Sequence, residues 1–214
     1  LNLVRRGAYF RPMLKDLVVV ETAGVLAGPA VGMFFAELGA TVIKLENRRA
    51  GGDVTRKWKL PAEDPASPVS AYFSSVNWGK EHRMVDLATP EDRAAFDGLI
   101  ATADVLITNH LAEDAEKLGL QRARIRDLNP RLIHAHIKGF AQQPQRPAFD
   151  VVLQAETGYI SMTGTDADHP AKLPIALIDV LAVLVEDTAI IGIHERVGTA
   201  LKFVVNPRSA FEII

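Results

Sequence analysis

The sequence predicts an α/β fold: a Rossmann-like, doubly wound and mainly parallel open sheet flanked by helices. Short β-branched runs alternate with helical segments along most of the chain, and this order is typical of parallel sheets with helices on both faces. The first unit is a strand over residues 17–21, a helix over 30–38 and a second strand over 41–45. Because parallel neighbours need a crossover connection, these three elements predict a βαβ unit.

Local signals set the ends of the other elements. Pro29 suits the first position of the opening helix, and Gly39 suits its C-terminal cap. Thr89 and Pro90, followed by two acidic residues, are typical of a helix start, so a helix is expected from there to about Thr102. The remaining expected elements are a helix or strand over 70–76, strands over 84–87, 104–108 and 132–137, and helices over 112–118, 122–129, 149–158 and 178–191.

Composition excludes several classes of protein. The 214 residues carry a formal net charge of −2 without a basic cluster, so nucleic acid is not an expected partner. The absence of cysteine excludes disulfides, thiolate metal sites and a cysteine nucleophile, and it fits a cytoplasmic location. No apolar run approaches the roughly 18 residues of a membrane span, so no membrane association is expected.

The turn between the first strand and the first helix carries small residues of the kind that ligand-binding loops use. It contains Gly24, Gly28 and Gly32, but neither the GxGxxG nor the P-loop spacing. Ligands of open α/β sheets bind at the carboxyl ends of strands, where small residues let backbone N–H groups approach an anion. From these residues alone, a ligand site and a merely tight turn are equally open.

No metal site and no hydrolase motif is recognisable. His134 and His136 alternate on the strand expected over 132–137 and would face one side, but a third ligand is not apparent. Ser161 and Thr163 lie outside a GxSxG setting, which excludes an α/β-hydrolase. We therefore expect no metal.

An ordered series of motifs resembles the class III CoA-transferases, the family that includes formyl-CoA transferase. The longest is LVVVETAGVLAGPAVGMFFAELGATVIKLE at residues 17–46. It is followed by GDxTR at 52–56, YFSSVNxGK at 72–80, ADVLIxN at 103–109, KGF at 138–140 and PIAxxD at 174–179. The match covers about residues 14–182, and it implies a domain that binds coenzyme A.

The resemblance places the catalytic nucleophile at Asp179. In this family a carboxylate attacks the thioester of an acyl-CoA, giving a mixed anhydride and then an enzyme–CoA thioester, from which an acceptor carboxylate takes the CoA. This implies an acyl-CoA:carboxylate CoA-transferase whose partners are an acyl-CoA donor and a carboxylate acceptor. From the residues alone, Asp179 would rather cap the helix that follows it, and the two roles are compatible.

The resemblance also implies which residues bind coenzyme A. Leu26 and Ala27 would lie against the nucleotide in the first turn, Asn47 and Arg48 follow the second strand, and Asn109 ends the strand over 104–108. The further implied ligands are a basic residue for a phosphate and three residues along the pantetheine channel: Lys117, Lys138, Gly139 and Phe140. Without the resemblance, the basic residues of this set would be assigned to the solvated surface.

Phe149 distinguishes the chain from a related branch, the α-methylacyl-CoA racemases. In that branch a histidine precedes the aspartate found here as Asp150, and it serves as a proton-transfer base. Racemisation needs an acid/base group on each face of the α-carbon, so the phenylalanine favours transfer. A cap for the following helix is the other role open to Asp150.

The resemblance fades after residue 182, and the chains of this family are much longer. We expect an N-terminal extension at 1–13, a CoA-binding Rossmann-like domain at 14–200 and a divergent tail at 201–214, with the small second domain of the family missing. Because known members form interlocked dimers, a homodimer is implied for a full-length form. A truncated, non-catalytic CoA-binding domain is the alternative that this division leaves open.

Overall fold

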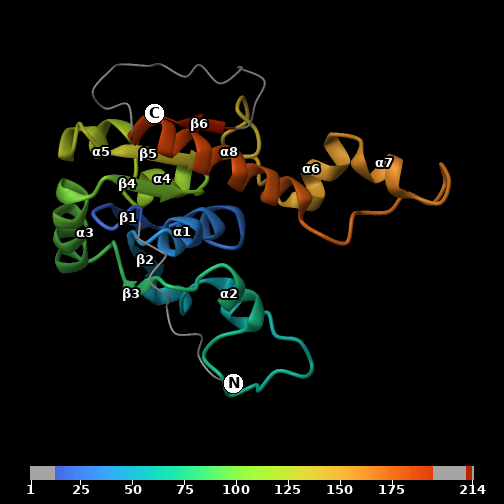
Figure 1. Ribbon diagram of the computed structural model, residues 1–214, viewed down its shortest axis with the longest axis horizontal. Helices are drawn as coiled ribbons and strands as arrows, with labels where there is room; N and C mark the ends of the chain where they lie inside the picture. Colours follow the sequence, from blue (N-terminus) through green and yellow to red (C-terminus); the bar gives the residue numbers. More distant parts are fainter. Residues whose placement is uncertain (1–12, 195–210, 214) are drawn as a thin grey trace.

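A six-stranded sheet runs through the molecule, with helices against both of its faces (Figure 1). The computed structural model describes residues 13–194 and 211–213. In sequence order the strands are β1 (Val18–Glu21), β2 (Thr41–Asn47), β3 (Glu81–Val85), β4 (Val105–Thr108), β5 (Ile133–Ile137) and β6 (Phe211–Ile213). Their order across the sheet is β3-β2-β1-β4-β5-β6; the first five pair in parallel, and β6 pairs antiparallel with β5. The predicted α/β fold with a mainly parallel open sheet is therefore confirmed.

Eight α-helices are described. They are α1 (Ala27–Glu37), α2 (Ala71–Ser75), α3 (Pro90–Thr102), α4 (Ala112–Lys117), α5 (Arg122–Leu128), α6 (Asp150–Glu156), α7 (Tyr159–Thr163) and α8 (Leu177–His194). Of these, α1 and α8 pack on one face of the sheet and α3 and α5 on the other. Two short 3-10 turns, Arg48–Ala50 and Val54–Lys57, follow β2. None of the described helices is both long and apolar enough to span a membrane.

Alternating side chains of the strands build two separate cores. On one face, Val19 and Val105 pack with Phe35 of α1 and Ile190 of α8. On the other face, strand residues Val20, Ile43 and Leu106 pack against helices α3 and α5. The helix residues in this core are Phe96 and Ile100 of α3 and Ile125 of α5. Fully burying one such side chain contributes roughly 1.5–3 kcal/mol to folding. The two cores therefore hold the strand ends, from which the loops of the site extend, in fixed positions.

Several element boundaries differ from those that the sequence predicted. Helix α1 begins at Ala27, so Pro29 is its third residue rather than its first. Proline is accepted there because N–H groups in the first turn have no acceptor inside the helix. Strand β3 begins at Glu81, three residues before the expected start at 84. It lies at the edge of the sheet with exposed polar side chains, so it lacks the apolar pattern of a buried strand.

Side-chain caps explain where other helices begin and end. Thr89 accepts a hydrogen bond from the Asp92 amide at 3.3 Å, which confirms the predicted start of α3. Ser70 accepts one from the Phe73 amide at 2.9 Å, so the segment left open between helix and strand is the helix α2. The helix expected over 149–158 is α6, which ends two residues earlier, at Glu156; Gly158 has φ +86°, and the separate short helix α7 follows.

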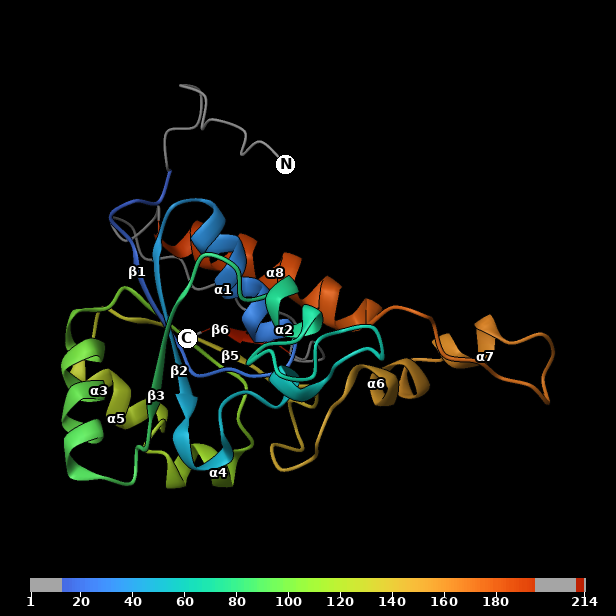
Figure 2. The same ribbon diagram turned by 90° about the horizontal axis from the view of Figure 1, so that it is seen from below.

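The α6–α7 segment extends away from the sheet, and α8 leads back to it (Figure 2). The buried side chain of Gln154, in α6, bonds to the segment that leads back into α8. Its side-chain amide donates to the Ile175 carbonyl at 3.1 Å and accepts from the Leu173 amide at 2.8 Å. This pair of bonds fixes the approach to the first turn of α8.

The described part of the predicted tail, β6, belongs to the same sheet as the rest of the domain. Residues 1–12 of the extension predicted at 1–13 lie outside the described part of the chain, as do residues 195–210 and 214. The division at residues 13 and 200 remains a prediction.

Two adjacent carboxylates of α8, those of Glu186 and Asp187, are buried, and three of their oxygens have no hydrogen-bond partner among the described residues. Burial raises the pKa of Glu186 to about 7. Burial and the neighbouring Glu186 charge raise the pKa of Asp187 to about 8. The folded protein thus binds these protons more tightly than the unfolded chain does.

Folding stability should therefore fall as the pH rises from 5 to 8. The stability from each neutral carboxyl is complete below its ordinary pKa and is lost as the pH passes the raised pKa. We expect Glu186→Gln to flatten this dependence by on the order of 2 kcal/mol, measured by urea unfolding at several pH values. The matched change Glu113→Gln, at a side chain that is 70% exposed, should leave the slope unaltered. Equal slopes in all three proteins would contradict this account.

Candidate active site

A cavity of about 750 Å³ lies beyond the carboxyl ends of β1, β2, β4 and β5. Its walls come from the turns after these strands and from parts of α6 and α8. Strands β1 and β4 are neighbours at the topological switch point of the sheet: β2 and β3 follow on the outer side of β1, whereas β5 follows on the outer side of β4. Open α/β sheets bind their ligands at such a switch point, so this cavity is the candidate site.

Eight of the ten predicted site residues line this cavity. They are Leu26, Ala27, Asn47, Asn109, Lys138, Gly139, Phe140 and Asp179. Gly139 is required by packing, because a Cβ there would lie 1.9 Å from the Cβ of Ala148. The fold therefore brings together residues that are as much as 153 positions apart between Leu26 and Asp179.

Arg48 and Lys117 lie outside the cavity lining. The Arg48 guanidinium donates to the Met84 carbonyl at 2.9 Å and lies 3.1 Å from the Asp92 carboxylate. The Lys117 side chain is 71% exposed and approaches Glu113 only to 3.8 Å. Binding of coenzyme A by these two residues remains a prediction.

Helix α1 presents an uncapped N-terminus at the cavity. Leu26 is the cap residue, its side chain makes no capping hydrogen bond, and no acidic residue lies in the first turn. The first N–H groups of a helix lack acceptors inside the helix, and together they favour an anion. The lining residues Leu26 and Ala27 thus belong to a position suited to a phosphate group.

Asn109 shapes the turn after β1. Its amide oxygen accepts from the Gly24 N–H at 3.0 Å, and its NH₂ group donates to the Gly24 carbonyl at 2.8 Å. The oxygen and the NH₂ group of the Asn109 side chain thus both bond to the backbone of Gly24. The site also includes Lys44 and Asp53, buried residues that the sequence prediction did not select.

The acid at the end of β2 is not available for a ribose. Dinucleotide-binding sheets of this topology use such an acid for the ribose hydroxyls. Here Glu46 accepts two bonds from Arg56, at 2.7 and 2.6 Å, and lies 3.0 Å from His82 Nδ1. Burial opposes ionisation, but the bonds from Arg56 and His82 prevail and lower the pKa of Glu46. Its role is to anchor the segment after β2.

Asp179 is the third residue of α8 and lies in the first turn, where it is half-buried. The alternative that it caps this helix is wrong, because Asp150 does so from α6. One Asp150 oxygen accepts from the Ile178 amide at 2.7 Å and from the Asp179 amide at 3.2 Å. The other oxygen accepts from Gln154. Asp150 therefore caps α8 and not the helix that it starts.

The environment of Asp179 keeps its carboxylate weakly solvated. Among the described residues, no side chain or amide donates to it. Burial and the nearby negative charge of Asp150 raise the pKa of Asp179 to about 6. The residue is thus mostly ionised at neutral pH and has little hydrogen bonding to lose when it attacks an electrophile.

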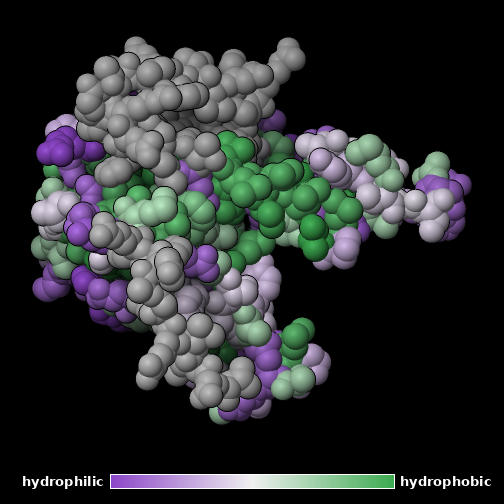
Figure 3. All heavy atoms as spheres, viewed as in Figure 1, coloured by the Kyte–Doolittle hydropathy of each residue, from purple (hydrophilic) through white to green (hydrophobic). Residues whose placement is uncertain are grey.

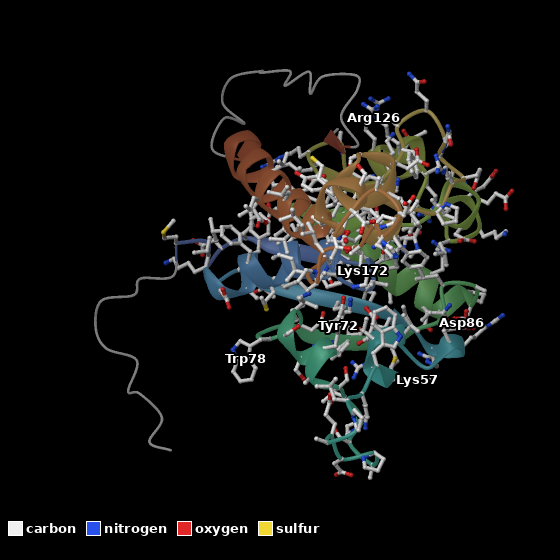
Figure 4. The ribbon with its side chains drawn as sticks, turned by 90° about the vertical axis from the view of Figure 1, so that its right-hand side faces the viewer. Lys57, Tyr72, Trp78, Asp86, Arg126 and Lys172 are labelled. Atoms are coloured by element: carbon white, nitrogen blue, oxygen red, sulfur yellow. The ribbon has the colours of Figure 1, made fainter. Side chains whose placement is uncertain are left out.

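Sequence reasoning missed two further residues near the cavity. Arg146 lines it, with its guanidinium 3.9 Å above the Phe140 ring and paired with Glu156. Tyr72 of α2, labelled in Figure 4, packs against Trp58 at 5.1 Å between ring centroids. Burial and the charges of Asp179, Asp53 and Asp150 raise the pKa of Tyr72, so its hydroxyl remains a donor. The motif YFSSVNxGK contained Tyr72, whereas Arg146 lies outside the motifs that carry the family resemblance.

The two alternating histidines of β5 do face one side, as expected. The Thr108 hydroxyl lies 3.0 Å from His134 Nε2 and 2.8 Å from His136 Nδ1. Within the described ranges, no three metal-ligating side chains form a group.

The ionisation of Asp179 should depend on Asp150. In Asp150→Asn, the amide oxygen still accepts from the α8 backbone, but the negative charge is gone. We expect the pKa of Asp179 to fall below about 6 and to stay above its ordinary value because burial remains. Carboxyl-detected NMR titration measures this. The matched control is Asp97→Asn, since Asp97 pairs with Arg124 outside the cavity lining. An unchanged or raised pKa in Asp150→Asn would refute the electrostatic coupling.

Comparison with known proteins identifies one family for this chain. The family model for CoA-transferase family III matches residues 14–195. Succinate–glutarate CoA-transferase of Agrobacterium fabrum is 38% identical over 186 residues, which cover 84% of this chain and 46% of the relative. Succinyl-CoA:mesaconate CoA-transferase of Haloarcula hispanica is 34% identical, with 87% and 49% covered.

Solved structures agree with the sequence comparison. A CAIB/BAIF family protein from Brucella suis superposes with a TM-score of 0.77 at 34% identity, and the match covers 87% of this chain and 50% of that protein. A hypothetical protein from Mycobacterium tuberculosis gives a TM-score of 0.73 at 31% identity, with 85% and 51% covered. The chain spans about half the length of these relatives, and it belongs to the class III CoA-transferase family.

Proposed function

We propose that the protein containing this chain transfers coenzyme A from an acyl-CoA to a carboxylate, with Asp179 as the nucleophile. The observation that carries the proposal is the position of Asp179 in the same cavity as the uncapped start of α1. One end of the cavity suits a phosphate-bearing ligand, and the carboxylate suits attack on a thioester. Two of the relatives are named for succinate and glutarate and for succinyl-CoA and mesaconate, which supports a dicarboxylate as the acyl group.

The proposed chemistry needs no redox partner. An Asp179 oxygen bonds to the acyl carbon while the C–S bond breaks, giving a mixed anhydride and the CoA thiolate. The thiolate attacks the Asp179 carbonyl, releases the donor carboxylate and forms a thioester with the enzyme. The acceptor carboxylate attacks this thioester to give a second anhydride, and the returning thiolate takes the new acyl group and frees Asp179.

Charged residues along the cavity support coenzyme A as the substrate. Lys138 and Arg146 line it, together with the apolar ring of Phe140. Cations suit the phosphates, and an apolar wall with close backbone approach at Gly139 suits the pantetheine chain. No metal is proposed for any step.

We include two features of the setting in this proposal, a cytoplasmic location and a homodimer of the full-length protein. Apolar residues gather on the surface of α8 (Figure 3), where Val180, Leu181 and Val185 are exposed. Apolar patches of this kind are typical of surfaces that another polypeptide covers.

Covalent trapping tests the nucleophile. Incubation of the full-length protein with succinyl-CoA should add the mass of an acyl or CoA group, and hydroxylamine should convert Asp179 to a hydroxamate. Asp179→Ala should lose the adduct and lower turnover by at least about 10³-fold. Coenzyme A binding without an adduct or exchange would instead favour the non-catalytic alternative.

Arg146 should contribute to the affinity for coenzyme A. Loss of one charge-assisted contact in Arg146→Gln is expected to raise the dissociation constant about tenfold, as measured by calorimetry. Arg126→Gln, at an exposed residue of α5 outside the cavity lining, is the control and should bind like the unchanged protein. Equal affinities in all three proteins would exclude Arg146 as a ligand.

A further inference from the structure

The turn after β1, residues 22–26, rests on a buried ionic pair. Lys44 Nζ donates to Glu21 Oε1 at 2.8 Å and to the Ala23 carbonyl at 2.7 Å, and it lies 3.3 Å from Asp53 Oδ2. All three charged side chains are at most 2% exposed. An ammonium group has three protons to donate, and three acceptors surround it here. Lys44 is therefore saturated and is not a direct ligand, although it borders the cavity.

Asp53 bonds to the same turn from the other side. Its Oδ2 accepts from the Val25 amide at 3.2 Å, while Oδ1 accepts from the Thr55 amide at 3.0 Å and from the Thr55 hydroxyl at 2.8 Å. The Asp53 amide in turn donates to Glu46 at 2.9 Å. Both carboxylate oxygens are therefore used, and the residue is itself held in place.

Val25 has a backbone conformation that valine avoids. Its φ is +73°, and it is the one non-glycine residue with positive φ in the described part of the chain. The left-handed conformation costs an L-residue roughly 1–2 kcal/mol, and a β-branched side chain is a clear outlier there. Such strain persists only where surrounding bonds hold it. Here the bonds lie at Ala23, Gly24 and Val25 themselves.

The strained residue comes directly before the part of the turn that faces the ligand. Leu26 and Ala27 follow it, line the cavity and begin α1. A relaxed φ at Val25 would redirect the chain at this point. Resting on the proposed function, we infer that Asp53 and Lys44 are positioning residues for coenzyme A: they hold Val25 in the left-handed conformation that aims the start of α1 at the ligand.

Asp53→Asn tests this in the full-length protein. Asparagine keeps the shape but offers one oxygen, so either Val25 or Thr55 loses its acceptor, and Lys44 loses an ionic partner. The dissociation constant for coenzyme A, measured by calorimetry, should rise about tenfold. The matched control is Asp97→Asn, which removes the Arg124–Asp97 pair away from the cavity lining. It should bind coenzyme A within about twofold of the unchanged protein.

Rescue separates a positioning role from a merely structural one. Glycine adopts positive φ without steric cost, so adding Val25→Gly to Asp53→Asn should restore most of the lost affinity. Because Val25→Gly also relieves strain in the fold, urea unfolding is measured in parallel and binding is compared only on folded protein, so that restored affinity reports the turn and not a general gain in stability. Thr55→Val removes only the hydroxyl bond to Asp53 and should weaken binding about threefold, with the same rescue. This milder variant decides the matter if Asp53→Asn does not fold.

The outcomes distinguish this inference from the function on which it rests. No binding of coenzyme A by the unchanged protein would overturn the proposed function. Binding by the unchanged protein, with Asp53→Asn and Thr55→Val no weaker than Asp97→Asn, would overturn the inference alone. Weakened variants that Val25→Gly does not restore would overturn it as well.

Discussion

The ionic contact between Lys44 and Glu21 is the constraint on which the ligand side of the molecule depends. Both residues lie on central strands, and their side chains are almost completely buried. Burial opposes the charged form of Lys44, but Glu21 and Asp53 outweigh it and raise the pKa of the ammonium. Removing Lys44 would leave Glu21 and Asp53 as buried carboxylates without the cation that they share, a loss of about 3–5 kcal/mol. A single substitution at either Lys44 or Glu21 is therefore expected to destabilise the fold.

A second buried lysine connects the same pair to α1. Lys80 donates to the other Glu21 oxygen at 2.8 Å and to the Pro29 carbonyl at 2.7 Å. Gly32 of α1 packs against this point, since a Cβ there would lie 1.9 Å from Glu21 Oε2. The Glu21 carboxylate at the end of β1 therefore limits how closely α1 approaches the sheet, and only glycine fits at position 32 of α1.

The sequence allowed the fold to be predicted because the central strands are apolar and β-branched and because Thr89 marks the start of α3 as its cap. Sequence-based prediction failed for features that depend on contacts between residues far apart in the chain. Strand β3 gains its length from pairing with β2, a feature that its polar side chains conceal. Asp150 bonds across 29 positions to the Asp179 amide, so no local pattern shows that it caps α8. Asn109 was identified through a family motif, but its bonds to Gly24 are visible only in the structure.

Three acids of one helix show how burial divides carboxylates between chemistry and structure. Asp179, Glu186 and Asp187 all belong to α8, and burial raises the pKa of each. Asp179 is half-buried and has a pKa of about 6, so it is mostly ionised at neutral pH. Asp187 is more deeply buried, has a pKa of about 8 and is mostly neutral. A nucleophile needs the charged form with few donors around it. The first turn of α8 provides this combination at Asp179, which is half-buried and mostly ionised at neutral pH.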